Sequence, residues 1–139
     1  MTPVKPPVVG VGLDLLEVER LERAAGRWGT AFLKRVFSPR ELAEAGGGRD
    51  HWMRLAARFC AKEAVFKALG AGRPHLGWRD VEIVRGPEGA PEAVLGGRAL
   101  ERARALGVER VLVSLTHLRG LAGAQAVAVA RGGAEQGDW

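Results

Sequence analysis

The sequence contains few of the residues that cross-link a chain or anchor it in a membrane. Among its 139 residues there is one cysteine, Cys60, there is no tyrosine, and aromatic residues make up only 6%. A single cysteine excludes an internal disulfide and a zinc site built from cysteines. No apolar run approaches the roughly 20 residues needed to cross a bilayer, and the proline-broken start lacks the apolar segment of a signal peptide. We therefore expect a cytoplasmic protein with no membrane partner.

What the sequence does contain fits one folded domain. Apolar residues make up 47% of the chain and charged residues 27%, which is typical of a globular protein of this length. We expect a single domain over residues 1–139, with loose tails at 1–7 and 132–139. The net charge of +5 predicts attraction to anions. Charge alone leaves open whether these are nucleic acids, acidic proteins or phosphorylated metabolites.

The spacing of apolar residues predicts both helices and strands. Strands are expected at 8–14, 80–85, 92–95, 111–116 and 124–130, and helices at 14–25, 31–45, 50–69 and 98–105. Within 31–45, Ser38 before Pro39 predicts the start of a separate helix. Turn residues at 86–89 and 119–120 predict two hairpins, so neighbouring strands should be antiparallel.

The first expected strand ends in an acid whose role has two interpretations. One face of this strand carries only Gly10, Gly12 and Asp14. Such glycines let a ligand or another strand approach closely, or they mark a bulge. Asp14 and Glu17 have the spacing of a capping box, so capping a helix that buries Trp28 is the preferred interpretation of Asp14 on the residues alone. A functional role for this carboxylate is the alternative.

The helix expected at 50–69 carries an acid on its apolar face. That face consists of Trp52, Leu55, Phe59 and Phe66. Glu63 falls on the same stripe, and a carboxylate there needs a cation, either a side chain or a metal. Lys67 is one candidate, although a Glu–Lys pair at this spacing is also a common feature of helix surfaces.

Four cations accompany Glu63 on this helix. They are Arg54, Arg58, Lys62 and Lys67. Together they suggest a polyanionic ligand. Gly70 is most simply the C-terminal cap of the helix, but a loop containing Gly70 and Gly72 also offers backbone N–H groups to phosphate.

Basic side chains occur at two further places. Arg20, Arg23 and Arg27 follow one side of the first expected helix, where they either dock an acidic helix or form a solvated face balanced by glutamates. His117 ends the strand at 111–116 and should lie at the rim of the sheet. A structural role is the simpler interpretation of a lone histidine there.

Three blocks of the sequence resemble a known family. They are Gly10-Val-Gly-Leu-Asp14-Leu-Leu-Glu17-Val-Glu-Arg20, Arg58-Phe-Cys-Ala-Lys62-Glu63-Ala-Val-Phe-Lys67-Ala-Leu-Gly70, and Val113-Ser114-Leu-Thr-His117 followed by Ala122-x-Ala124. In this order and spacing they resemble the holo-acyl-carrier-protein synthase type of 4′-phosphopantetheinyl transferase over residues 8–130. The resemblance implies an α+β fold with an antiparallel sheet and helices packed on one side. It also implies a homotrimer with sites at subunit boundaries.

The same resemblance implies an activity and a metal. The activity is transfer of the phosphopantetheine arm from coenzyme A to a serine of an acyl carrier protein, which releases adenosine 3′,5′-bisphosphate. Asp14 and Glu63 match the family's Mg²⁺ ligands, and Mg²⁺ favours one or two carboxylates together with phosphate oxygens. Glu63 is also the expected base for the serine, directly or through a metal-bound water, a choice that the sequence leaves open.

The remaining site residues follow from the match to the family. Arg58, Lys62, Lys67 and His117 match the neighbourhood that contacts phosphate, and Lys67 is expected to serve the leaving phosphate as a third catalytic residue beside Asp14 and Glu63. Arg20 and Arg27, on the same arginine row as Arg23, would face carboxylates of the carrier protein.

Two alternatives remain from other classes of protein. One is a basic module that binds nucleic acid, against which stand the few aromatics and the acids beside the cations. The other is a different Mg²⁺-dependent phosphoryl-transfer enzyme or phosphodiesterase using the same acids. We expect the carrier protein and coenzyme A, and no nucleic acid, as partners.

Overall fold

The computed structural model describes residues 7–70 and 76–131. The strands are β1 (Val8–Glu17), β2 (Val81–Arg85), β3 (Pro91–Leu95), β4 (Val108–Leu118) and β5 (Leu121–Ala130). The helices are α1 (Val18–Trp28), α2 (Thr30–Val36), α3 (Pro39–Ala45), α4 (His51–Ala68), the short 3-10 helix η2 (Trp78–Asp80) and α5 (Gly97–Leu106). Residues 1–6 and 132–139, which include nearly all of both expected tails, lie outside the described residues.

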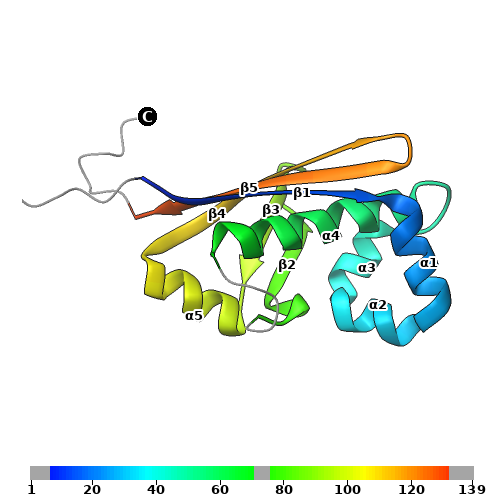
Figure 1. Ribbon diagram of the computed structural model, residues 1–139, viewed down its shortest axis with the longest axis horizontal. Helices are drawn as coiled ribbons and strands as arrows, with labels where there is room; N and C mark the ends of the chain where they lie inside the picture. Colours follow the sequence, from blue (N-terminus) through cyan, green and yellow to red (C-terminus); the bar gives the residue numbers. More distant parts are fainter. Residues whose placement is uncertain (1–6, 71–75, 132–139) are drawn as a thin grey trace, which may run out of the picture.

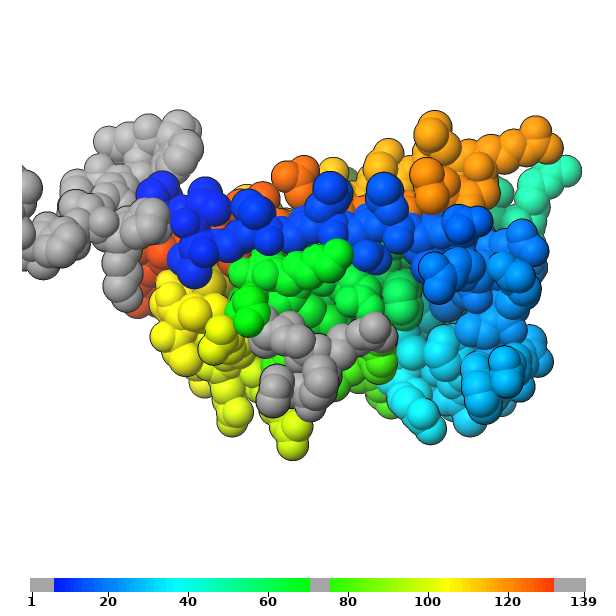
Figure 2. Space-filling model, in the orientation of Figure 1, coloured from blue at the N-terminus to red at the C-terminus, as the bar shows by residue number. Residues whose placement is uncertain are grey.

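The strands form two antiparallel sheets. The larger sheet has the order β1-β5-β4, and the β2–β3 hairpin forms the second. All the helices lie on one side of the larger sheet, with α4 running directly beneath it (Figure 1). Figure 2 shows β1 in blue along the upper edge, with α4 in green immediately below. The expected α+β architecture, both hairpins and the separate α3 after Ser38 are confirmed.

The glycines of β1 allow α4 to approach the sheet very closely. A Cβ atom added at Gly12 would lie 1.9 Å from the carbonyl oxygen of Ala64, and one at Gly10 would lie 2.0 Å from that of Ala68. Both neighbours are helix backbone, which cannot move aside as a flexible side chain can. The bare face of β1 therefore receives a helix, where the sequence left open a ligand, another strand or a bulge. A register irregularity also lies between Val8 and Gly10.

The expected helix cap at Asp14 is wrong. Strand β1 continues to Glu17, with Asp14 opposite Ala124 and Glu17 opposite Leu121 of β5. Pairing with β5 holds these residues extended, so α1 begins only at Val18 and has no side-chain cap. The expected burial of Trp28 is also wrong, because this residue ends α1 with its ring exposed beside the Arg27 guanidinium, 5.0 Å from its centroid.

The larger sheet has an apolar face that no described residue covers. On β1 and β4, five large apolar side chains are exposed on this side, which we call the outer sheet face: Val11, Leu13, Leu15, Leu112 and Leu118. The register confirms that they share a side, since Val11 and Leu112 lie opposite the same residue, Val127 of β5. Large apolar side chains exposed together on one face of a sheet are typical of a contact with another protein.

Candidate functional site

One group of charged residues lies at the β1 edge of the sheet. Lys67, on the last turn of α4, places its Nζ 3.4 Å from Asp14 Oδ1 and donates a hydrogen bond to the Leu13 carbonyl at 2.8 Å. The Asp14 side chain is 20% exposed and that of Lys67 is 54% exposed, so solvent and ligands reach the pair. Asp14 and Lys67, 53 residues apart in the sequence, are therefore in contact.

Cys60 lies on α4, about one turn before Glu63 and two turns before Lys67. Burial raises the pKa of the Cys60 thiol to about 12, and the charges of Asp14 and Glu63 act in the same direction while that of Lys67 opposes them. The thiol itself is buried and donates to the carbonyl of Ala122. Asp14 and Lys67 thus meet at the junction of β1 and α4, and Glu63 lies on α4 one turn before Lys67.

These residues suit a hard divalent cation. Asp14 and Glu63 supply carboxylate oxygens, which Mg²⁺ prefers, and the Lys67 ammonium already acts as a counter-ion to Asp14. Within residues 7–70 and 76–131, no three His, Cys, Asp or Glu side chains cluster as a complete metal cage. A cation held here would keep coordination positions for substrate oxygens and water.

Lys62 does not belong to this group, and its expected contact with phosphate is wrong for the described chain. Its side chain is fully buried, with Nζ 2.8 Å from Glu41 Oε1. Burial lowers the pKa of Lys62, and the Glu41 carboxylate opposes that shift. The sequence identifies Lys62 as a cation near Glu63. It does not reveal that α3 and β2 bury this side chain, because those elements are distant in the sequence.

Arg58 is also largely committed to the protein. Its Nε donates to the Ile83 carbonyl at 3.3 Å, and its Nη2 lies 3.2 Å from Glu44 Oε1. Burial alone would raise the pKa of Glu44, but hydrogen bonds from the Arg85 backbone, Arg58 and Arg40 outweigh it and lower that pKa. Arg58 is therefore held in place, with only its edge open to a cavity.

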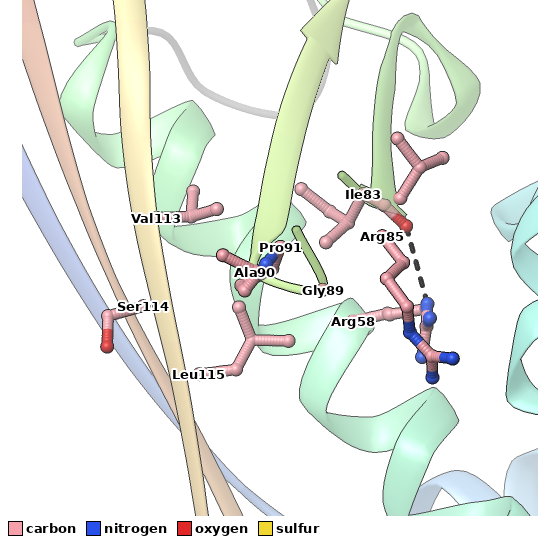
Figure 3. A pocket seen from close by; sticks show the side chains of 10 residues that line it. Arg58, Ile83, Arg85, Gly89, Ala90, Pro91, Val113, Ser114 and Leu115 are labelled. Atoms are coloured by element: carbon pink, nitrogen blue, oxygen red, sulfur yellow. Dashed lines mark hydrogen bonds between the residues drawn. The ribbon is translucent and has the colours of Figure 1, made fainter. Parts of the chain in front are cut away.

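Two cavities adjoin Arg58 on the β4 side of the molecule. The first, of about 420 Å³, lies between Arg58, the β2–β3 hairpin and β4. In Figure 3, Val113 and Leu115 point from β4 toward the hairpin, whereas Ser114 points to the other side of the strand. The second, of about 380 Å³, is lined by Met53, Arg54, Ala57, Arg58, Leu115, Thr116 and His117. His117 lies at the rim of the sheet, as its position at the strand end predicts.

The described residues therefore form two separate halves of a site. Asp14 and Lys67 lie at the β1 edge, while His117 and the cavities lie beside β4, and β5 separates the two strands. Gly70, at the end of α4, has φ 65° and caps the helix, with Arg102 donating to the preceding carbonyl of Leu69 at 3.0 Å. Gly72 lies outside the described residues.

The arginine row on α1 is exposed, as expected. Arg20, Arg23 and Arg27 all face solvent. Arg23 makes only a loose pair with Glu19, at 3.8 Å between two exposed side chains. Such a pair contributes little to stability. The row is free to meet acidic groups of a partner.

The acids that form ion pairs with the buried cations were not predicted from the sequence. Glu41 pairs with Lys62 and Glu44 with Arg58, both from α3. The capping box of Ser38 and Glu41 is visible in the sequence as a Ser and a Glu three residues apart. Its second role, holding a lysine 21 residues further along, has no local signal.

The sequence and the fold both match known proteins. The chain belongs to the 4′-phosphopantetheinyl transferase superfamily, whose family model matches residues 10–129. Within that superfamily its relatives are holo-[acyl-carrier-protein] synthases. The protein of Moorella thermoacetica is 45% identical over 116 residues, which cover 84% of this chain and 90% of the relative. That of Solibacter usitatus is 41% identical and covers 82% and 92%.

Solved structures give the same result. The holo-[acyl-carrier-protein] synthase of Neisseria meningitidis matches with a TM-score of 0.78 and 32% identity, covering 87% of this chain and 98% of that one. The Helicobacter pylori enzyme in complex with coenzyme A matches with a TM-score of 0.75 and 29% identity, covering 85% and 98%. These matches confirm the family resemblance that the three sequence blocks indicate.

Proposed function

We propose that the protein transfers the 4′-phosphopantetheine arm of coenzyme A to a serine of an apo-acyl carrier protein in the cytoplasm. The products are the holo-carrier and adenosine 3′,5′-bisphosphate. The observation that carries the proposal is the contact between Asp14 and Lys67 at the junction of β1 and α4, with Glu63 one turn before Lys67, in a chain of this family. No helix of the described segments is both long and apolar enough to span a membrane.

Asp14 and Glu63 would hold Mg²⁺, which supplies positive charge to the pyrophosphate oxygens when it is bound. Lys67 would then exchange its ion pair with Asp14 for a contact with phosphate. Its ammonium, released from Asp14, neutralises the charge that develops on the leaving phosphate. Glu63 would act as the base for the serine hydroxyl, which is a poor nucleophile until it loses its proton.

We further propose a homotrimer in which each site draws on two chains. The outer sheet face offers the apolar surface for such a contact. The two halves of the site also favour it, because a ligand touching both the β1 edge and the β4 cavities of a single chain would have to reach around the sheet. A neighbouring chain can instead present its β4 edge to Asp14 and Glu63.

Replacing Val11 with Lys should disrupt this assembly. The lysine would bury a charge in an apolar contact, so we expect monomers at micromolar concentration by light scattering after size-exclusion chromatography. Val94→Lys is the matched control, because Val94 is also an exposed strand valine but lies on β3, away from the outer sheet face. Trimers that persist in Val11→Lys, or a wild-type monomer, would contradict the proposed assembly.

Replacing Arg20 with Glu should raise the KM for the carrier protein about tenfold while leaving the KM for coenzyme A unchanged, because close charge pairs across an interface contribute about 1.4 kcal/mol or more. The effect should shrink as salt is added. Arg98→Glu makes the same charge change at an exposed residue of α5 and should leave both constants unchanged. An equal rise in both KM values for Arg20→Glu would refute the docking role.

The activity itself is tested by incubating the protein with coenzyme A, Mg²⁺ and an apo-carrier protein. Mass spectrometry should show the carrier gaining one phosphopantetheine group, with adenosine 3′,5′-bisphosphate released in equal amount. Hydrolysis of coenzyme A without modification of the carrier would favour a phosphodiesterase. Tight binding of DNA with no reaction would favour the nucleic-acid module.

A further inference from the structure

Outside the site, Lys62 and Glu41 form a buried ion pair with several further hydrogen bonds. Both side chains are fully buried, and Nζ and Oε1 are 2.8 Å apart. Lys62 also donates to the carbonyl oxygens of Trp78, at 3.0 Å, and Val81. An ammonium has three N–H donors, and here each has an acceptor. Lys62 therefore has no proton left for a ligand.

Glu41 extends the same network into two further elements. Its Oε1 accepts from the Ser38 backbone N–H and its Oε2 from that of Ile83, both at 2.8 Å. The Ser38 hydroxyl in turn donates to Glu82. The pair thus joins α4 to the first turn of α3, to η2 and to β2.

On its other side, α4 is fixed by the sheet. Gly10 and Gly12 of β1 rest directly on the backbone of Ala68 and Ala64. Glu63 lies between this contact and Lys62 along the helix. Adjacent residues are about 100° apart around a helix, so fixing the direction of Lys62 also fixes that of Glu63.

We propose that the Lys62–Glu41 pair is a positioning device that sets the rotation of α4 and so aims Glu63 at the cation it shares with Asp14. Lys62 is then a positioning residue for transfer and makes no contact with coenzyme A. This inference rests on the proposed function for the role of Glu63, but its geometry is independent of the substrate.

Stability alone gives a weak account of such a pair. Two buried charges lose hydration, and replacing both by uncharged groups of similar shape often leaves stability unchanged or raises it. Uncharged replacements would not fix the orientation of the two side chains. The five hydrogen bonds and ion contacts of this pair do so, because each is directional. The pair is therefore expected to matter more for geometry than for stability.

The test is the double variant Lys62→Met/Glu41→Gln, which removes both charges together. Binding of Mn²⁺ to the free enzyme should weaken about 10- to 100-fold, the usual effect of losing a residue that orients a metal ligand. The kcat should fall by a similar factor, while the KM for coenzyme A stays within about twofold. Lys34→Met, at an exposed lysine of α2, is the matched control and should change none of these values.

Three results would overturn the inference. They are unchanged Mn²⁺ binding in a folded double variant, unchanged kcat, or a selective rise in the KM for coenzyme A, which would make Lys62 a phosphate contact. If the double variant does not fold, Glu41→Asp keeps the charge but shortens its reach, and it should weaken Mn²⁺ binding in the same direction. Wild-type protein that binds Mn²⁺ but modifies no carrier would refute the proposed function and leave the metal-binding comparison intact.

Discussion

Changing Glu63 to Gln, or Asp14 to Asn, should reduce transfer at least about 10³-fold and leave the fold intact. Each change removes one negative charge and keeps the shape of the side chain. A metal ion stabilises developing charge by several kcal/mol, and each 1.4 kcal/mol corresponds to a tenfold rate change. The rate of carrier modification is measured at saturating coenzyme A, and circular dichroism reports the fold.

The control for this pair of variants is Glu101→Gln, at an exposed residue of α5 far along the chain from the acids. It should retain the wild-type rate. Raising Mg²⁺ should recover part of the activity of Asp14→Asn, because one carboxylate remains to bind the ion more weakly. Wild-type activity in either site variant would refute the role of the two acids as metal ligands needed for transfer.

Changing Gly12 to Ala should destabilise the protein by about 3 kcal/mol, at the upper end of the cost of adding atoms to a packed interior. The added Cβ would lie 1.9 Å from the Ala64 carbonyl oxygen, so β1 and α4 must separate. Separation moves Asp14 away from Glu63 and Lys67, and transfer should be lost with stability. Urea unfolding at a fixed protein concentration measures the first effect.

Gly26 provides the matched control for this substitution. It lies within α1, and a Cβ added there meets nothing within 4 Å. Gly26→Ala should therefore raise the free energy of unfolding by about 0.5 to 1 kcal/mol, because alanine favours a helix over glycine. If Gly12→Ala were as stable as Gly26→Ala, the close packing of β1 on α4 would not be what holds the acids in place.

The periodic elements could be predicted from the sequence because their signals are local. Turn residues around Gly120 predicted the β4–β5 hairpin, and Ser38 before Pro39 predicted the start of α3. The interpretation of Asp14 failed because a local capping pattern competed with pairing to β5, more than 100 residues away, and the sheet prevailed. Local spacing contains no information about that partner.

The same difference between local signals and long-range contacts applies to the candidate site. Glu63 and Lys67 share a helix, so their proximity could be predicted from their spacing, whereas the contact between Lys67 and Asp14 has no local signal in the sequence. Lys62 was assigned to the phosphates because it is a cation beside Glu63. Its true partner, Glu41, lies on another helix, and only the tertiary packing of α3 and β2 on α4 removes Lys62 from solvent.

The central claim is that Asp14 and Glu63 share one divalent cation. Crystals grown with coenzyme A and Mn²⁺ in place of Mg²⁺ test it most directly, because the anomalous signal locates the ion. We expect one ion within about 2.2 Å of an oxygen from each carboxylate and bound to the pyrophosphate, with Lys67 turned from Asp14 to the phosphate. An ion bound elsewhere, or carboxylates too far apart to share it within a chain or across a subunit boundary, would show that Asp14 and Glu63 do not form a metal site.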